Sequence, residues 1–205
     1  FESLSAKVPV VELTASDSEM GTKAAKDYEL GAKTMYHWAE CESQLKKYDS
    51  AQQKFLAVGE KWPKSKLADD SLYSAADAAL RGNRVADAME LVTQFPTRFA
   101  QSSLLPLNEM LKGRVLLARG DSVEATDLPA AQADFQQASE LFQNILTTSP
   151  TPRMANQARI LLGRAEKRLN HPQKVIEALT PLSEMIKKGE KGSEEYSDAL
   201  PTLGE

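Results

Sequence analysis

The chain has 205 residues, of which 41% are hydrophobic, so it can bury a sizeable core as one domain or as an array of small units. A net charge of −4, from 25 basic and 29 acidic residues, opposes broad attraction to phosphate backbones and argues against a nucleic-acid partner. A single cysteine excludes an internal disulfide, and no apolar run approaches the ~20 residues that cross a bilayer.

The amino-terminal part predicts an extended arm and then a long helix. Residues 1–15 hold a short apolar run that Pro9 interrupts, which suits an arm or linker. Ser16 and Glu19 form a capping-box pattern, and apolar residues then follow helical spacing to about Lys47. Because the chain begins at Phe1 and nothing resembles a signal peptide, we interpret it as a mature or trimmed fragment.

The stretch from Tyr48 to Pro96 predicts two helix pairs in succession, each ending in an aromatic residue and a proline. Trp62-Pro63 and Phe95-Pro96 close the two parts, because proline cannot continue a helix. Asp49 is expected to cap the first of these helices and Ser65 the next. The helices of the second hairpin are expected near 66–81 and 84–94.

Two further hairpins follow. An apolar stripe from Leu104 to Ala118 predicts a helix that ends at Gly120, and residues 121–129 read as an insertion before a helix that Asp127 begins. Thr151 with Pro152 predicts the next helix start, and Pro181 is expected to bend the last helix of this hairpin. Residues 189–205 begin a further or capping helix.

A repeated pattern connects these segments. Ala51, Phe55, Val58 and Pro63 recur at identical spacing as Ala138, Phe142, Ile145 and Pro150. Each preceding helix carries a small residue where the two helices of a hairpin approach, at Ala39, Ala76, Gly113 and Gly163. Over residues 30–188 the chain resembles the tetratricopeptide repeat (TPR) family, whose unit combines such positions with a closing proline.

The resemblance implies an all-α, right-handed α-α superhelix of about four hairpins over residues 16–188. The side chains expected between the helices are Trp38, Phe55, Leu72, Val92, Phe142, Leu162 and Leu179. The Trp-Pro and Phe-Pro endings are also similar to bacterial envelope proteins of the outer-membrane assembly lipoprotein type. That similarity places the bacterial periplasm or envelope ahead of the cytoplasm as the expected compartment.

No pattern in the sequence predicts catalysis, a metal site or a cofactor. Cys41 lies one helical turn from His37, but two further ligands of a zinc site are missing, and Cys41 is expected to be a small core residue. His171 precedes a proline in a turn and is expected to be an exposed cap residue. The acidic pair Asp69-Asp70 is explained by the helix dipole in a first helical turn. We therefore expect a protein without enzymatic activity.

In the TPR family the first helices of the hairpins line a groove, and this register predicts the protein-binding residues. They are Lys33, Tyr36, Glu40, Gln44, Tyr73, Asp77, Arg114, Arg164, Lys167 and Arg168.

The last four groove residues concentrate positive charge, which would attract an acidic segment of a partner protein; a solvated basic face is the alternative. Two functions remain open: a scaffold that binds a peptide or protein segment in this groove, and a purely architectural segment of a larger array. The sequence leaves the oligomeric state open.

Overall fold

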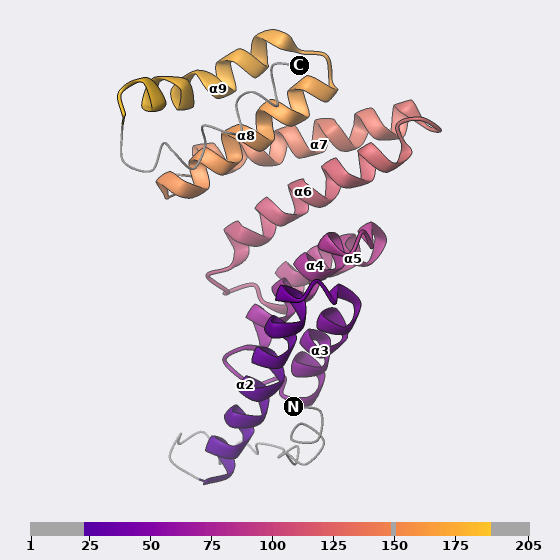
Figure 1. The fold of residues 1–205 in the computed structure, drawn as a ribbon, viewed down its shortest axis with the longest axis vertical. Coiled ribbons are helices and arrows are strands. Elements are labelled where there is room, and N and C mark those ends of the chain that lie inside the picture. The colour runs from indigo at the N-terminus through magenta and orange to yellow at the C-terminus, as the bar shows by residue number, and fades with distance from the viewer. Residues whose placement is uncertain (1–22, 149–150, 190–205) are drawn as a thin grey trace. The chain divides into compact units, whose positions relative to one another are not determined.

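The computed structural model describes residues 23–148 and 151–189, which form α-helices and contain no strand (Figure 1). The all-α prediction is therefore confirmed for the described residues. The helices are α2 (Lys23–Gln44), α3 (Tyr48–Lys61), α4 (Ala68–Arg81), α5 (Val85–Arg98), α6 (Leu105–Val123), α7 (Leu128–Thr147), α8 (Pro152–Arg168) and α9 (Pro172–Lys187). None of them combines the length and the apolar content that crossing a membrane requires.

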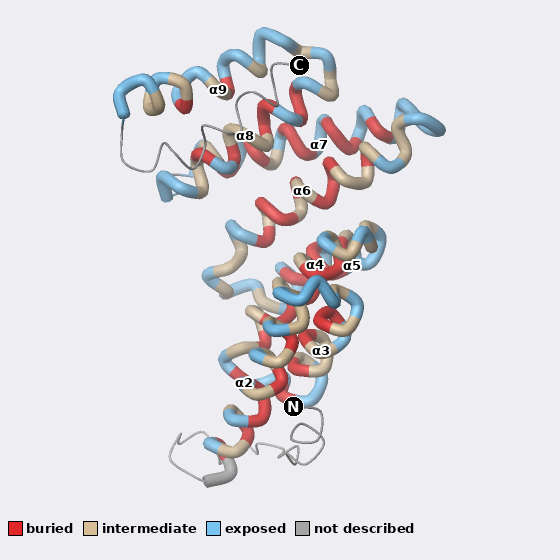
Figure 2. The backbone as a smooth tube through the Cα atoms, viewed as in Figure 1, coloured by how far each residue is buried: buried red, intermediate tan, exposed pale blue. Residues whose placement is uncertain are grey.

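The chain divides into two compact units, Phe1–Asn108 and Glu109–Glu205. In unit 1, α2 packs on α3 and α4 packs on α3 and α5; in unit 2, α8 packs on α7 and α9. Figure 2 shows that buried positions recur along each helix between exposed ones, as expected for helices that each bury one stripe. The expected arm and the first capping box lie outside the described residues, and so do residues 190–205 of the expected final segment.

The same backbone turn joins the helices of three hairpins. Lys46, Asn83 and Asn170 each have a φ of about 60°, the left-handed conformation that commonly ends a helix. The amide of the next residue donates to the carbonyl five residues before it, with N···O distances of 2.9, 2.8 and 2.9 Å at Lys47, Arg84 and His171. The repeat seen in the side chains is thus also present in the backbone.

The predicted core residues are mostly buried. Phe55, Leu72, Val92, Phe142 and Leu162 are buried, whereas Trp38 and Leu179 are half-buried. The ammonium group of Lys54 lies over the Trp38 ring, 4.2 Å from its centroid, and pairs with Glu42 at 2.9 Å.

Pro96 does not end the helix as predicted, because α5 continues to Arg98. A proline inside a helix lacks the amide that would bond to the carbonyl four residues earlier, here that of Val92. The side-chain amide of Asn108 replaces this donor, with Nδ2 3.0 Å from the Val92 oxygen, and Asn108 is itself buried. A residue twelve positions along the chain thus satisfies the carbonyl that Pro96 leaves free.

Two predicted caps are wrong. Asp49 lies in the first turn of α3, where it pairs with Arg84 Nε at 3.0 Å, and the N-cap position belongs to Lys47. Ser65 lies before α4 and accepts a hydrogen bond from the amide of Leu67 at 3.2 Å, while its hydroxyl donates to Glu29 on α2. Both side chains therefore connect elements instead of capping helices.

The third hairpin has no long insertion. Helix α6 continues beyond Gly120 to Val123, and Asp127 caps α7 as predicted by accepting from the amide of Ala130. Gly120 is required by packing and not by a turn, since a Cβ atom there would lie 2.5 Å from Phe135 Cε1. Of residues 121–129, the first three lengthen α6, the last two begin α7, and residues 124–127 form the link between the helices.

The fourth hairpin begins as predicted, because Thr151 caps α8 by accepting from the amide of Met154. Pro181 lies inside α9, and the bend expected there stays a prediction.

Candidate protein-binding surface

All ten predicted groove residues are at least partly exposed in the structure. Four are exposed, namely Lys33, Gln44, Arg164 and Lys167, and the other six are half-buried. The neighbouring small residues Ala39, Ala76 and Gly113 on the same helices are buried. Each first helix thus turns a small residue into its hairpin and a polar or aromatic residue to the accessible side.

In unit 1 the surface is aromatic and acidic. The Tyr36 hydroxyl on α2 lies 3.2 Å from Ser74 Oγ on α4, and its ring packs edge-on against Phe55 with centroids 5.2 Å apart. Burial raises the pKa of this hydroxyl, and the carboxylates of Glu40 and Asp70 raise it further against the effect of its hydrogen bond to Ser74. Tyr36 therefore connects the first helices of two consecutive hairpins.

Asp70 also belongs to this surface, although the sequence pattern predicts for it only an interaction with the helix dipole. Burial raises the pKa of its carboxyl group, and the nearby carboxylates of Asp69 and Glu40 raise it further. Glu40 also accepts from His37 Nδ1 at 2.7 Å. Asp70 lies one helical turn before Ser74 on α4, and this spacing is the sequence signal that could have placed Asp70 beside Tyr36.

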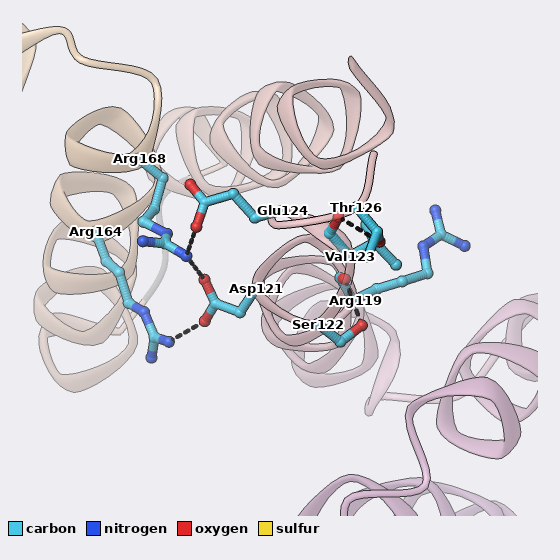
Figure 3. Close-up of polar contacts among 8 residues, drawn as sticks. All are labelled: Arg119, Asp121, Ser122, Val123, Glu124, Thr126, Arg164 and Arg168. Atoms are coloured by element: carbon cyan, nitrogen blue, oxygen red, sulfur yellow. Dashed lines mark hydrogen bonds and ion pairs between the residues drawn. The ribbon is translucent and has the colours of Figure 1, made fainter. Parts of the chain in front are cut away.

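In unit 2 two of the predicted arginines are paired with carboxylates. Arg164 and Arg168 extend from α8 toward the carboxyl-terminal end of α6 (Figure 3). Arg164 Nη2 lies 2.5 Å from Asp121 Oδ2, and Arg168 Nη2 lies 2.7 Å from Asp121 Oδ1 and 2.6 Å from Glu124 Oε2. The guanidinium of Arg168 also lies over the ring of Phe135, 5.1 Å from its centroid.

These pairs change the expected electrostatics of the surface. Two arginines face two carboxylates, so the concentration of positive charge predicted here is largely balanced. Asp121 and Glu124 were not predicted to contact α8, because residues 121–129 were predicted to be an insertion. The structure instead extends α6 to Val123 and so places Asp121 on a helix beside α8. Lys167 is exposed and lies outside this network of pairs, whereas Arg119 points away from it (Figure 3) and pairs with the buried Asp134.

His37 and Cys41, the two residues considered as zinc ligands, belong to no possible metal-binding group in the described part of the chain. Among the described residues no group of three or more histidine, cysteine, aspartate or glutamate side chains could hold a metal ion. Cys41 is exposed, so its prediction as a core residue is wrong. Its helix position places it beyond the stripe that Ala39 and Met35 bury, which is why the general tendency of cysteine to be buried misled.

His171 is at the predicted N-cap position of α9, but its side chain makes no capping hydrogen bond. Its Nδ1 instead lies 2.7 Å from Glu166 Oε2, and Glu166 is buried. The histidine is therefore attached to α8 by its side chain as well as by its backbone amide.

A comparison with protein-family models found one that matches residues 29–179 and is described as outer membrane lipoprotein, YfiO. The matched segment begins inside α2 and ends inside α9, so it covers part or all of each of the four hairpins. None of the curated protein sequences gave a significant match.

Proposed function

The chain belongs to the YfiO family of outer membrane lipoproteins, and from this membership we propose that it is a scaffold that binds a segment of a partner protein in the bacterial cell envelope. Within a unit, the segment would lie along the first helices of the TPR-like hairpins. The scaffold acts without catalysis, since its role is to hold a partner by surface complementarity.

The observation that carries this proposal is the division of each first helix into a buried and an accessible side. Small residues such as Ala39 and Gly113 are buried in the hairpins, whereas the accessible side carries Tyr36, Arg164 and the other predicted groove residues. Half-buried aromatic and arginine side chains are typical of protein interfaces, where they combine apolar area with hydrogen-bonding groups. The match to an envelope lipoprotein family supports the proposed compartment.

An acidic segment remains the proposed guest in unit 2, but it must compete with the protein's own carboxylates. Arg164 already pairs with Asp121, yet half of its side chain, 52%, is accessible, and Lys167 is exposed beside it. A guest carboxylate can therefore share Arg164 or replace Asp121. Removing the internal carboxylates should strengthen binding of an acidic guest, because it frees both arginines.

The experiment compares three proteins: the parent, a variant with Asp121→Asn and Glu124→Gln, and a variant with Arg164→Glu and Arg168→Glu. Fluorescence anisotropy measures the binding of a labelled peptide of alternating glutamate and serine, with a lysine-serine peptide as the control. We expect the first variant to bind the acidic peptide about 5–10-fold more tightly than the parent, which corresponds to about 1.0–1.4 kcal/mol. The arginine variant should lose binding.

Circular dichroism spectra of the three proteins must agree, because the pairs also join α6 to α8. If acidic-peptide affinity is the same in all three proteins while the stability of both variants falls, the arginines serve only the architecture of unit 2. That result would leave the aromatic surface of unit 1 as the site of the proposed function.

A further inference from the structure

Unit 2 contains a pocket of about 410 Å³ that does not belong to the first-helix surface. Helices α7, α8 and α9 supply its lining: Gln143, Leu146, Arg159, Leu162, Glu166, Lys174, Glu177 and Ala178. None of these residues is among the predicted groove residues. The volume falls within the range of small-molecule sites and exceeds the space of a single water molecule many times.

A buried carboxylate that is already satisfied lies in this pocket. Glu166 is 1% exposed, and its Oε1 accepts from Ser139 at 2.5 Å and from Gln143 at 3.4 Å. Its Oε2 accepts from His171 at 2.7 Å and lies 3.8 Å from the ammonium group of Lys174. Each oxygen thus has two partners, so Glu166 has little capacity left to bind a cationic ligand.

Of the two cations in the pocket lining, Arg159 is the one for which the described residues supply no ion-pair partner. Its Nη1 donates to the side-chain oxygen of Asn156 at 3.3 Å, and within the described part of the chain no carboxylate lies at ion-pair distance from it. Lys174 shares the single carboxylate of Glu166 with His171 and is half accessible. Glu177, the other acidic side chain in the lining, accepts from Gln173 at 3.3 Å.

The walls add an apolar component. Leu146, Leu162 and Ala178 come from three different helices, and Leu162 and Ala178 are buried. A ligand that fits this lining needs an apolar part against the leucines and an anionic part for the guanidinium of Arg159. A carboxylate meets the second requirement best, because its two oxygens match the paired donors of a guanidinium.

We infer that this pocket binds a short apolar chain that carries a carboxylate group. Either a free alkyl carboxylate or a glutamate beside a leucine in a partner segment offers this chemistry. The site is separate from the first-helix surface, so it does not depend on the proposed function.

Titration with hexanoate tests the inference, with hexylamine and hexan-1-ol as probes of the same chain length. Nuclear magnetic resonance shifts of the Leu146 and Leu162 methyl groups and of the Ala178 amide should report saturable binding of hexanoate. We expect hexanoate to bind at least 5-fold more tightly than either other probe. Arg159→Gln should weaken hexanoate at least 5-fold, whereas the control Lys187→Gln, at an exposed position of α9 outside the pocket lining and outside the first-helix surface, should not.

Equal or tighter binding of hexylamine would overturn the inference, and so would shifts that Arg159→Gln leaves unchanged. A second ligand, acetyl-Leu-Glu-amide, distinguishes the two sources. Tighter binding of this dipeptide than of hexanoate identifies a partner segment, and the reverse order identifies a free carboxylate. The Arg159→Gln variant must keep the parent's far-ultraviolet spectrum, which its partial exposure and its single contact to Asn156 lead us to expect.

Discussion

Replacing Phe55 with alanine should lower the free energy of unfolding of unit 1 by about 3–5 kcal/mol. Phe55 lies on α3, is only 3% exposed and supports the ring of Tyr36. The substitution removes most of an aromatic side chain and leaves a cavity that surrounding helices fill only in part. Urea titration followed by circular dichroism measures the change as a shift of the unfolding midpoint.

The matched control is Leu30→Ala on α2, where the side chain is 60% exposed. That substitution should change the unfolding free energy by less than about 0.5 kcal/mol, since few contacts are lost at the surface. Similar midpoints for the Phe55 variant and the parent would contradict the register that places Phe55 in the core, on the second helix of its hairpin.

Replacing Gly113 with alanine should destabilise unit 2 by about 1–3 kcal/mol, although alanine is the better helix former. A Cβ atom at Gly113 would lie 2.5 Å from Cε1 and Cζ of Phe142, and both residues are buried. Carbon atoms cannot approach so closely, so α6 and α7 must separate or the ring must leave its position. Thermal unfolding followed by circular dichroism measures the effect.

Gly59 provides the control for the intrinsic helix preference. It lies inside α3, and the nearest atom to an added Cβ is Arg98 Nη2 at 3.8 Å, which is ordinary contact. Gly59→Ala should therefore raise stability by up to about 1 kcal/mol. If the two substitutions shift stability in the same direction by similar amounts, the close packing of α6 on α7 is not what requires glycine at position 113.

The sequence predicted what depends on local pattern. Helical spacing placed Phe55 and Phe142 in the core, and the small residues at Gly113 and Gly163 marked the close approach of paired helices. The family resemblance is also confirmed, because the lipoprotein family model spans the same hairpins. Such features repeat along the chain, so each copy supports the prediction of the others.

The sequence did not predict features that join distant residues. Asn108 satisfies the carbonyl that Pro96 leaves free, and no local pattern relates an asparagine to a proline twelve positions earlier. Arg164 and Asp121 are 43 positions apart, and their pairing required the end of α6 to be recognised as helix. The charge of the surface therefore depends on which residues the fold brings together, and it could not be predicted from the first-helix residues alone.

Site-specific photo-crosslinking in cells that produce the protein tests the central claim most directly. A benzophenone amino acid replaces the exposed first-helix residues Gln44 and Lys167 in two variants, and the exposed second-helix residues Glu90 and Gln136 in two controls. If first helices bind the partner segment, Gln44 or Lys167 should give an adduct with a defined envelope protein, and the controls should not. Adducts from the controls alone, or equal adducts from all four positions, would contradict the assignment of the first helices as the binding surface.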